Sequence, residues 1–285
     1  MTDRPTPPDP ATELVAGDPR TRECVATNLA TVRARIARAC ERAGRDPSGV
    51  RLVAVTKYAK PEWVRAALDL GLRDLGENRP QQLIERAELY GSAPPPGIDQ
   101  SMPPEPDALA APGDAPRWHL IGPLQRNKAR KLLPKAVWIH SVDSVKLLET
   151  LHRIVFVEER WSAMPALLLE VNVSGETQKG GFRPDELESG VTDAAGLGGA
   201  VFGEEAFGRL PIRGLMTMAP LVDDQESARP VFLELRHLRD RLQDRWGRPL
   251  PELSMGMSGD FEVAVEEGCT QVRIGSALWD GLDEG

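Results

Sequence analysis

The chain has 285 residues, of which 41% are hydrophobic and 27% are charged, a composition typical of a folded globular protein. A single α/β barrel typically needs about 250 residues, so one domain accounts for the length. The formal net charge of -8 argues against a general nucleic-acid binder, which needs a basic surface for phosphates.

The three cysteines, Cys24, Cys40 and Cys269, form neither a CxxC pair nor a disulfide framework, and this usage favours a reducing cytoplasm. The N-terminus has no apolar run typical of a signal peptide. No window of about 18 apolar residues occurs anywhere in the chain. We therefore expect a cytoplasmic protein with no membrane span.

The N-terminal segment contains five prolines within residues 1–20 and is predicted to be a disordered leader. From Asp18 or Thr21 onward, apolar residues recur at helical spacing as far as Gly44. These residues are Val25, Leu29, Val32, Ile36 and Cys40. The folded domain is predicted to span residues 21–285.

Short apolar runs then alternate with helical segments, which is typical of βα units on a parallel sheet. The eight runs are 51–56, 73–77, 117–122, 136–142, 166–173, 212–218, 252–257 and 271–277. Helical stretches follow at 62–70, 80–90, 144–157 and 225–246. Eight parallel strands predict a single closed (β/α)8 barrel of the TIM type.

Two segments interrupt this series. Residues 92–116 hold eight of the 25 prolines and no periodic apolar face, so we predict a flexible insertion that the barrel does not need. Residues 196–209 are rich in glycine and are predicted to be an extended connection before the sixth strand.

A lysine follows the first predicted strand directly. Barrels of this type place their chemistry at the carboxyl ends of the strands, and Lys57 comes immediately after LVAVT. A lysine in a partly dry cavity can lose its proton and attack an aldehyde. The alternative is a solvated lysine at a strand end, which its position alone does not exclude.

The last two strands end in residues suited to an anion. Gly275 and Ser276 precede a short helix, where consecutive backbone N–H groups and a hydroxyl can hold a phosphate. Ser258, after the seventh strand, is predicted to cap the helix that begins at Gly259 and Asp260, and it can add a donor to the same site. The alternative for Gly275 is a glycine that only permits a turn.

Strand alternation places Arg273 on the face opposite Val272 and Ile274, so it points into the barrel if they pack outward. An inward arginine needs a partner, because an unpaired buried charge is costly. A pyridine nitrogen is one candidate, and an internal ion pair with a carboxylate such as Glu77 is the other.

Further polar residues, and one methionine, lie at the predicted strand ends. They are Glu77, Asn78, His119, Asn172, Ser174 and Met216. We interpret His119 as a residue that lines the pocket. No metal is predicted, because no His, Cys or acidic cluster has metal-ligand spacing.

Eight motifs together resemble, in this order, the pyridoxal phosphate homeostasis protein family. They are LVAVTK, DLGENRPQQL, WHLIGPLQRNKAR, HSVDS, LEVNVSGETQKGGF, IRGLMTMAP, LSMGMSGDFEVAVEEG and VRIGSALWDG. The resemblance covers residues 21–281 without the proline-rich insertion. Two positions depart from the family's pattern, Gly259 where a polar residue is expected and Thr56 where serine is common.

This resemblance implies a fold-type III barrel, similar to the N-terminal domain of alanine racemase, that binds pyridoxal 5'-phosphate (PLP). Lys57 would carry the cofactor as a Schiff base and Arg273 would face its pyridine nitrogen. The phosphate would be held by Ser258, Gly275 and Ser276. The ring would be surrounded by Asn78, Asn172 and Met216.

The resemblance also implies a non-enzymatic protein that buffers and delivers PLP, without catalytic residues. The alternative is an amino-acid racemase, because a Schiff-base lysine on this barrel is also the starting point of racemases. Those enzymes need a second acid/base group from an additional β-domain, which the sequence does not show. We therefore favour a monomeric carrier, with apo PLP-dependent enzymes as its expected partners. An inert scaffold, the third possibility, would show no Schiff-base absorbance.

Overall fold

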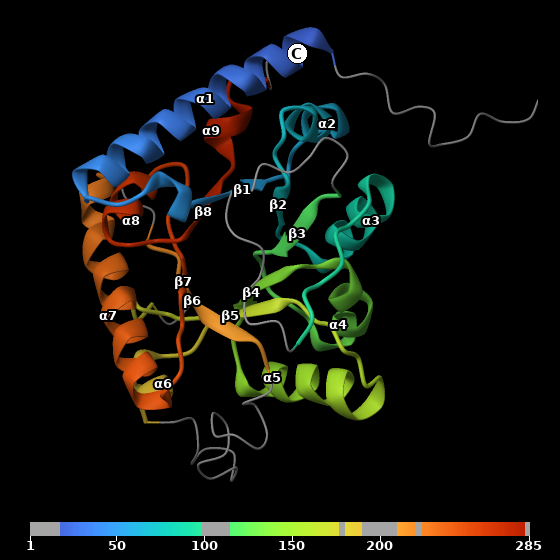
Figure 1. The fold of residues 1–285 in the computed structure, drawn as a ribbon, viewed down its shortest axis with the longest axis vertical. Helices are drawn as coiled ribbons and strands as arrows, with labels where there is room; N and C mark the ends of the chain where they lie inside the picture. Colours follow the sequence, from blue (N-terminus) through green and yellow to red (C-terminus); the bar gives the residue numbers. More distant parts are fainter. Residues whose placement is uncertain (1–17, 99–114, 177–179, 190–209, 221–223, 283–285) are drawn as a thin grey trace, which may run out of the picture.

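The computed structural model describes residues 18–98, 115–176, 180–189, 210–220 and 224–282. Eight parallel strands follow one another in sequence order around a closed barrel (Figure 1). They are β1 (Arg51–Val55), β2 (Asp74–Glu77), β3 (Arg117–Leu120), β4 (Trp138–Val142), β5 (Ala166–Glu170), β6 (Ile212–Met216), β7 (Glu252–Ser254) and β8 (Gln271–Ile274). Because β8 pairs with β1, the sheet has no open edge.

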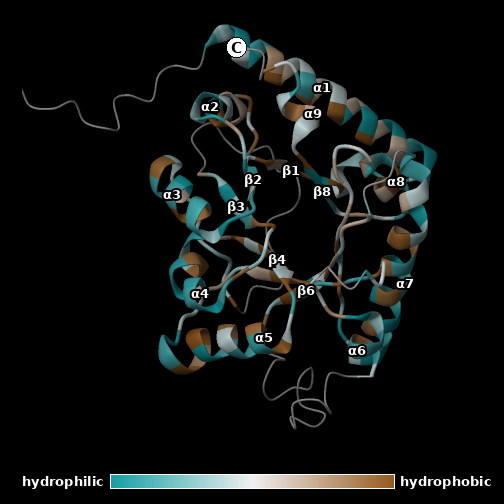
Figure 2. Ribbon diagram, turned by 180° about the vertical axis from the view of Figure 1, so that it is seen from behind, coloured by the Kyte–Doolittle hydropathy of each residue, from teal (hydrophilic) through white to brown (hydrophobic). Residues whose placement is uncertain are grey.

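The helices form a ring outside the barrel (Figure 1). They are α1 (Pro19–Arg42), α2 (Pro61–Asp69), α3 (Pro80–Tyr90), α4 (Arg126–Leu132), α5 (Val145–His152), α6 (Pro184–Glu188), α7 (Arg229–Trp246), α8 (Phe261–Glu266) and α9 (Ser276–Trp279). Hydrophobic residues alternate with hydrophilic ones along α5 and α7, as expected for helices with one face on the barrel (Figure 2).

The predicted barrel is confirmed, since each of the eight apolar runs contains one strand. Two helices, α4 and α6, lie where no helix was predicted, because seven and five residues are too few to show a periodic pattern. The first helix begins at Pro19, with Asp18 accepting a hydrogen bond from the Arg20 amide. Residues 18–20, assigned to the leader by sequence, therefore start α1. The rest of that leader lies outside the described residues.

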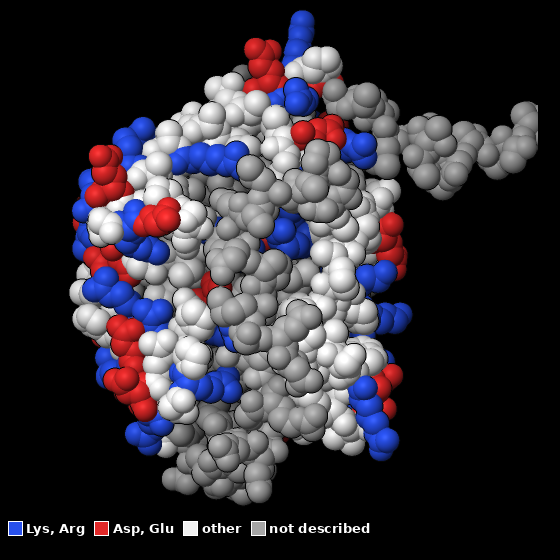
Figure 3. Space-filling model, viewed as in Figure 1, with Lys and Arg blue, Asp and Glu red and all other residues white. Residues whose placement is uncertain are grey.

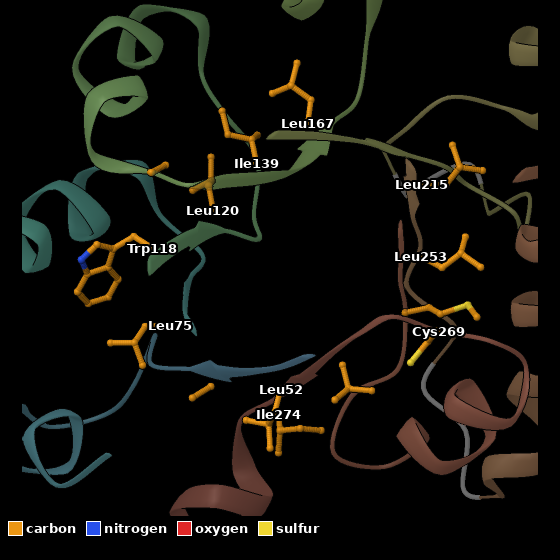
Figure 4. Packing of buried hydrophobic residues seen from close by; sticks show 14 of the residues in the cluster. Leu52, Leu75, Trp118, Leu120, Ile139, Leu167, Leu215, Leu253, Cys269 and Ile274 are labelled. Atoms are coloured by element: carbon orange, nitrogen blue, oxygen red, sulfur yellow. The ribbon is translucent and has the colours of Figure 1, made fainter. Parts of the chain in front are cut away.

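The main hydrophobic core lies between the strands and the helices. Side chains such as Leu52, Leu75, Leu120 and Ile274 lie around the outside of the barrel and point away from its axis (Figure 4). With Val272 and Ile274 in this outer layer, the neighbouring Arg273 turns inward, as predicted. The inside of the barrel holds a small apolar cluster and many polar residues.

The described flanks of the predicted insertion lie at the amino ends of the strands. Ala93 N–H donates to the Pro116 carbonyl at 2.8 Å, and Ile98 N–H donates to the Ser162 carbonyl at 2.9 Å, shortly before β5. The described parts of this connection, residues 91–98 and 115–116, therefore lie at the end of the barrel opposite the carboxyl ends of the strands. Residues 99–114, and also 196–209, lie outside the described residues.

Deleting residues 99–114 and joining the flanks with a short Gly/Ser linker is expected to leave the melting temperature unchanged within about 2–4 °C. The hydrogen-bonded flanks remain in this variant. The wider deletion of residues 92–116 removes those bonds and is expected to melt earlier. Scanning calorimetry of both variants makes the comparison. An equal, large loss in the two would show that residues 99–114 pack on the barrel.

The visible surface carries both signs of charge. Lysine and arginine side chains are interspersed with aspartate and glutamate around the periphery (Figure 3). Within the described part of the chain, no helix is long and apolar enough to cross a membrane.

Candidate functional site

The residues proposed from sequence as a site all come from the carboxyl ends of the strands, and the closed barrel gathers these ends in one rim. Lys57 follows β1, Asn78 follows β2 and Asn172 follows β5. Met216 ends β6, and Ser258 follows β7. The remaining three residues, Arg273, Gly275 and Ser276, are in or directly after β8, which pairs with β1.

Lys57 is exposed and lies in a groove of about 450 Å³. Its Nζ lies 5.1 Å from the centre of the Tyr58 ring. The Gln82 side chain of α3 donates a hydrogen bond to the Lys57 carbonyl at 3.2 Å, which ties the loop to the next helix. The groove is lined by Lys57, Tyr58, Asn78, Arg79, Gln81, Gln82 and Glu85.

A buried carboxyl group supports the loop that carries Lys57. Thr56 donates its hydroxyl to Glu77 Oε1 at 2.5 Å, and Arg86 Nε donates to the same oxygen at 2.9 Å. Arg86 also donates to the Ala59 carbonyl at 2.8 Å. Burial raises the pKa of Glu77, opposed by the Thr56 hydroxyl and the Arg86 charge. The ion pair suggested between Glu77 and Arg273 is therefore wrong, because Glu77 pairs with Arg86.

Asn78 packs against a glycine that sequence reasoning did not single out. A Cβ at Gly122 would lie 2.2 Å from the Asn78 carbonyl oxygen and 2.3 Å from its Oδ1. No other residue fits there without moving the backbone that carries Asn78. The glycine in WHLIG was the available signal, but only the fold shows which residue approaches it.

The residues proposed to hold a phosphate do converge. Ser258 Oγ accepts hydrogen bonds from the amides of Gly275 at 3.2 Å and Ala277 at 3.3 Å. The prediction that Ser258 caps α8 is wrong, because Asp260 is the N-cap residue. Its side chain accepts from the Met257 amide at 2.6 Å and so closes the loop before α8. Ser258 is left facing the loop after β8.

A tryptophan that the sequence analysis did not single out joins the segment after the last strand to the first strand. Trp279 in α9 donates its indole N–H to the Val55 carbonyl at 2.8 Å, two residues before Lys57. The same ring stacks on Trp63 of α2, with centroids 6.1 Å apart. The loop holding Gly275 is thereby fastened to the strand that carries Lys57.

Arg273 is buried inside the barrel with a relative exposure of 3%. Its Nη1 donates to Ser254 Oγ at 2.6 Å and its Nη2 donates to the Thr217 carbonyl at 2.9 Å. Burial lowers its pKa to about 10, opposed by the charges of Asp260 and Glu170, so it remains a cation at neutral pH. These bonds use two of the five N–H donors of a guanidinium.

The two remaining predicted ring neighbours differ in their surroundings. Asn172 organises its own loop, donating to the Glu176 carbonyl at 2.8 Å and accepting from the Gly175 amide at 3.1 Å. Met216 is buried inside the barrel beside Trp138 and Leu168. The approach of Asn172 and Met216 to a cofactor ring stays a prediction.

His119 lies deeper than predicted. Its ring is fully buried, with Nδ1 2.9 Å from His140 Nε2 and Nε2 2.9 Å from Asp74 Oδ1. Both ring nitrogens are thus used inside the barrel, and His119 does not line the rim. Within the described residues, no group of three His, Cys, Asp or Glu side chains is placed to hold a metal ion.

The geometry defines a parallel barrel protein that carries an exposed lysine and a serine bonded to the loop after β8 on one rim, with a buried arginine inside the barrel. This arrangement suits a phosphorylated pyridine aldehyde: an amine for the aldehyde, amide and hydroxyl donors for the phosphate, and a cation inside. No protein-family model matches the chain.

Curated relatives cover most of its length. The chain is 37% identical over 251 residues to the pyridoxal phosphate homeostasis protein of Aquifex aeolicus, covering 88% of this chain and 95% of that one. It is 37% identical over 265 residues to the protein of the same name from Pseudomonas aeruginosa, covering 92% and 97%. The chain belongs to the pyridoxal phosphate homeostasis protein family.

Solved structures agree on the fold. PipY of Synechococcus elongatus PCC7942 with PLP bound has a TM-score of 0.66 and 30% identity, covering 89% of this chain and 99% of that one. Alanine racemase from Corynebacterium glutamicum has a TM-score of 0.59 at 12% identity, covering 90% of this chain and 61% of the enzyme. At that identity the likeness concerns the fold alone.

Proposed function

We propose that this protein binds PLP through a Schiff base on Lys57 and buffers and delivers the cofactor to other proteins. The observation that carries the proposal is that Lys57 and the loop proposed to hold the phosphate follow two adjacent strands, β1 and β8. β1 pairs with β8 over four residue pairs, and Trp279 holds the loop after β8 against the end of β1. An amine and a phosphate site on adjacent strand ends match the two ends of one small cofactor.

The residues present fit this cofactor. A Cβ at Gly275 would meet Val55 at 3.5 Å, an ordinary contact, so packing within the protein does not require glycine there. We propose that the space beside Gly275 belongs to the phosphate, held by the hydroxyls of Ser258 and Ser276. PLP brings an aldehyde carbon that accepts an amine. Nζ of Lys57 would form a C=N bond to that carbon, and one water molecule would leave.

Ser258→Ala and Ser276→Ala are each expected to raise the Kd for PLP by about tenfold, because each removes one hydrogen bond to a charged phosphate. Equilibrium dialysis measures the effect. Ser189→Ala, an exposed serine at the end of α6, is the control and should bind like the wild type. Unchanged affinity in the double variant of Ser258 and Ser276 would place the phosphate elsewhere.

We propose a carrier rather than a racemase, because the three described residues considered for a second proton transfer, Tyr58, Tyr90 and His119, are not placed for it. Inversion at the α-carbon needs an acid/base group on the face opposite the lysine. Tyr58 adjoins Lys57 and is 84% exposed, and Tyr90 is engaged with the Pro61 carbonyl at 3.2 Å. His119 is buried with both ring nitrogens bonded. None of these residues is placed to protonate a substrate.

The wild-type protein is expected to absorb in the visible range as a Schiff base and, once reduced with borohydride, to carry the label on Lys57. The PLP-loaded form should activate an apo PLP-dependent enzyme while racemising no amino acid. Peptide mapping and an enzyme reactivation assay measure both. Label on another lysine would refute the assignment. Racemase turnover of about 1 per second or more would refute the carrier role.

We further propose that the protein acts as a monomer in the cytoplasm. All eight proposed cofactor residues come from the rim of one barrel, so the site needs no second chain. Cys24, Cys40 and Cys269 are free thiols, which suits a reducing compartment. Its proposed partners are apo PLP-dependent enzymes.

A further inference from the structure

Five polar side chains form an unbroken chain of hydrogen bonds across the inside of the barrel. Arg273 Nη1 lies 2.6 Å from Ser254 Oγ, which lies 2.8 Å from His140 Nδ1. His140 Nε2 lies 2.9 Å from His119 Nδ1, and His119 Nε2 lies 2.9 Å from Asp74 Oδ1. All five residues are buried. The chain joins β8, β7, β4, β3 and β2.

The Asp74 end gives this hydrogen-bonded chain a single direction. Burial lowers the pKa of both histidines, so each ring is neutral, with one donor and one acceptor nitrogen. A carboxylate only accepts, so His119 donates from Nε2 to Asp74 and accepts at Nδ1 from His140 Nε2. His140 then accepts at Nδ1, so the Ser254 hydroxyl donates to His140 while its oxygen accepts from Arg273. Each imidazole therefore carries its proton on Nε2.

The far end of the chain is anchored. Asp74 accepts from Arg117 Nε at 2.9 Å and pairs with Arg51 at 3.2 Å. Burial opposes its ionisation, but Arg117, His119 and Arg51 outweigh burial and hold its pKa well below the usual range. Asp74 is thus a fixed acceptor. It keeps His119 from turning its proton toward His140, which would reverse the chain.

The near end sets the orientation of Arg273. If the Ser254 hydroxyl had no acceptor at His140, it would be free to rotate, and its lone pairs would no longer be held toward Nη1. With the hydrogen-bonded chain intact, Ser254 of β7 accepts from Nη1 of the guanidinium, and the Thr217 carbonyl after β6 accepts from Nη2. The other N–H groups are then held in a set direction.

We infer that Ser254 and His140 are positioning residues that aim Arg273 at the pyridine nitrogen of PLP, through a hydrogen-bonded chain anchored on Asp74. This inference rests on the proposed function. Neither residue needs to touch the cofactor. Their effect passes through the orientation of the guanidinium.

The test measures the pyridine nitrogen directly. Protein loaded with PLP labelled with ¹⁵N in the ring should show the shift of an unprotonated nitrogen that accepts a hydrogen bond. Ser254→Ala is expected to move this shift toward that of a nitrogen without a bond and to raise the Kd by about tenfold. Thr150→Val, which removes a buried hydroxyl bonded within α5, is the matched control and should change neither.

A pair of variants at His140 tests the chain beyond Ser254. His140→Leu removes the acceptor and should reproduce the effect of Ser254→Ala. In His140→Asn the Oδ1 atom can replace Nδ1 as the acceptor, so the ring-nitrogen shift should return toward wild type. Wild-type shift and affinity in both Ser254→Ala and His140→Leu would overturn the inference.

Cofactor-free wild-type protein supplies a measurement that depends on neither the variants nor PLP. With ¹⁵N-labelled histidine, NMR should show His119 and His140 neutral, with the proton on Nε2, at pH 7. A proton on Nδ1 of His140, or a charged ring, would overturn the inference even if every variant failed to fold. If the wild type took up no PLP, the proposed function would fail. The histidine spectra would still show whether the hydrogen-bonded chain has the inferred direction.

Discussion

Lys57→Ala protein is expected to be colourless after exposure to PLP and to retain no label after borohydride reduction. The wild type should retain about one label per chain, because only an unprotonated primary amine at the site can form the C=N bond. Lys57→Arg keeps the charge but cannot form this bond, so it should also be colourless. Both variants should unfold within about 0.5 kcal/mol of the wild type, because the side chain is exposed.

Lys60→Ala is the matched control for this experiment. Lys60 lies on the same loop, with its Nζ 5.3 Å from the centre of the Trp63 ring. Absorbance and mass spectrometry of reduced peptides should show wild-type labelling in this variant. Persistent labelling of Lys57→Ala, together with loss of label in Lys60→Ala, would move the cofactor to the other lysine.

Asp74→Asn is expected to lower the free energy of unfolding by about 3–5 kcal/mol at pH 7, because it removes a buried carboxylate that pairs with Arg51 and Arg117 and accepts from His119. The side chain of Asp74 is only 5% exposed, so solvent cannot replace it. Urea titrations followed by circular dichroism measure the loss. Asp69→Asn, which breaks the half-exposed pair with Arg65 on α2, should cost less than about 1 kcal/mol.

The pH dependence of this difference follows from the direction of the pKa shift. Folding lowers the pKa of Asp74 below its ordinary value of 3.8, so the unfolded chain binds the proton more readily. The stabilisation by Asp74 is fully present above that value and is lost as the pH falls further. The gap between wild type and Asp74→Asn should therefore be constant from pH 8 to about pH 6.5 and should narrow below about pH 4. A constant gap down to pH 3 would contradict the shift.

The two buried histidines affect the stability of the folded protein at a higher pH than Asp74 does. Burial lowers the pKa of His119 and His140 below 6.5 in the folded protein, so the unfolded chain takes up protons first as the pH falls. The Asp74 charge opposes this lowering at His119, so below about pH 6.5 the histidines destabilise Asp74→Asn more than the wild type. The contribution of Asp74's own ionisation is therefore read from the narrowing below about pH 4.

The sequence by itself determined the fold class, the order of the strands and the rim position of the proposed site. This was possible because eight apolar runs, each followed by a turn or a helix, have one compact solution as a closed parallel barrel. Alternation also predicted the inward direction of Arg273, since a strand places successive side chains on opposite faces. These are local signals, readable within a few residues.

Only the tertiary structure decided the partners of the polar residues. Glu77 pairs with Arg86 rather than Arg273, and Ser258 bonds to the loop after β8 rather than to its own helix. The chain from Arg273 to Asp74 joins residues on five strands that no spacing in the sequence relates. A buried donor or acceptor takes whichever partner the closed barrel brings within hydrogen-bond distance. Residue patterns fix the face of the strand on which a side chain lies, but they do not say which side chain meets it across the barrel.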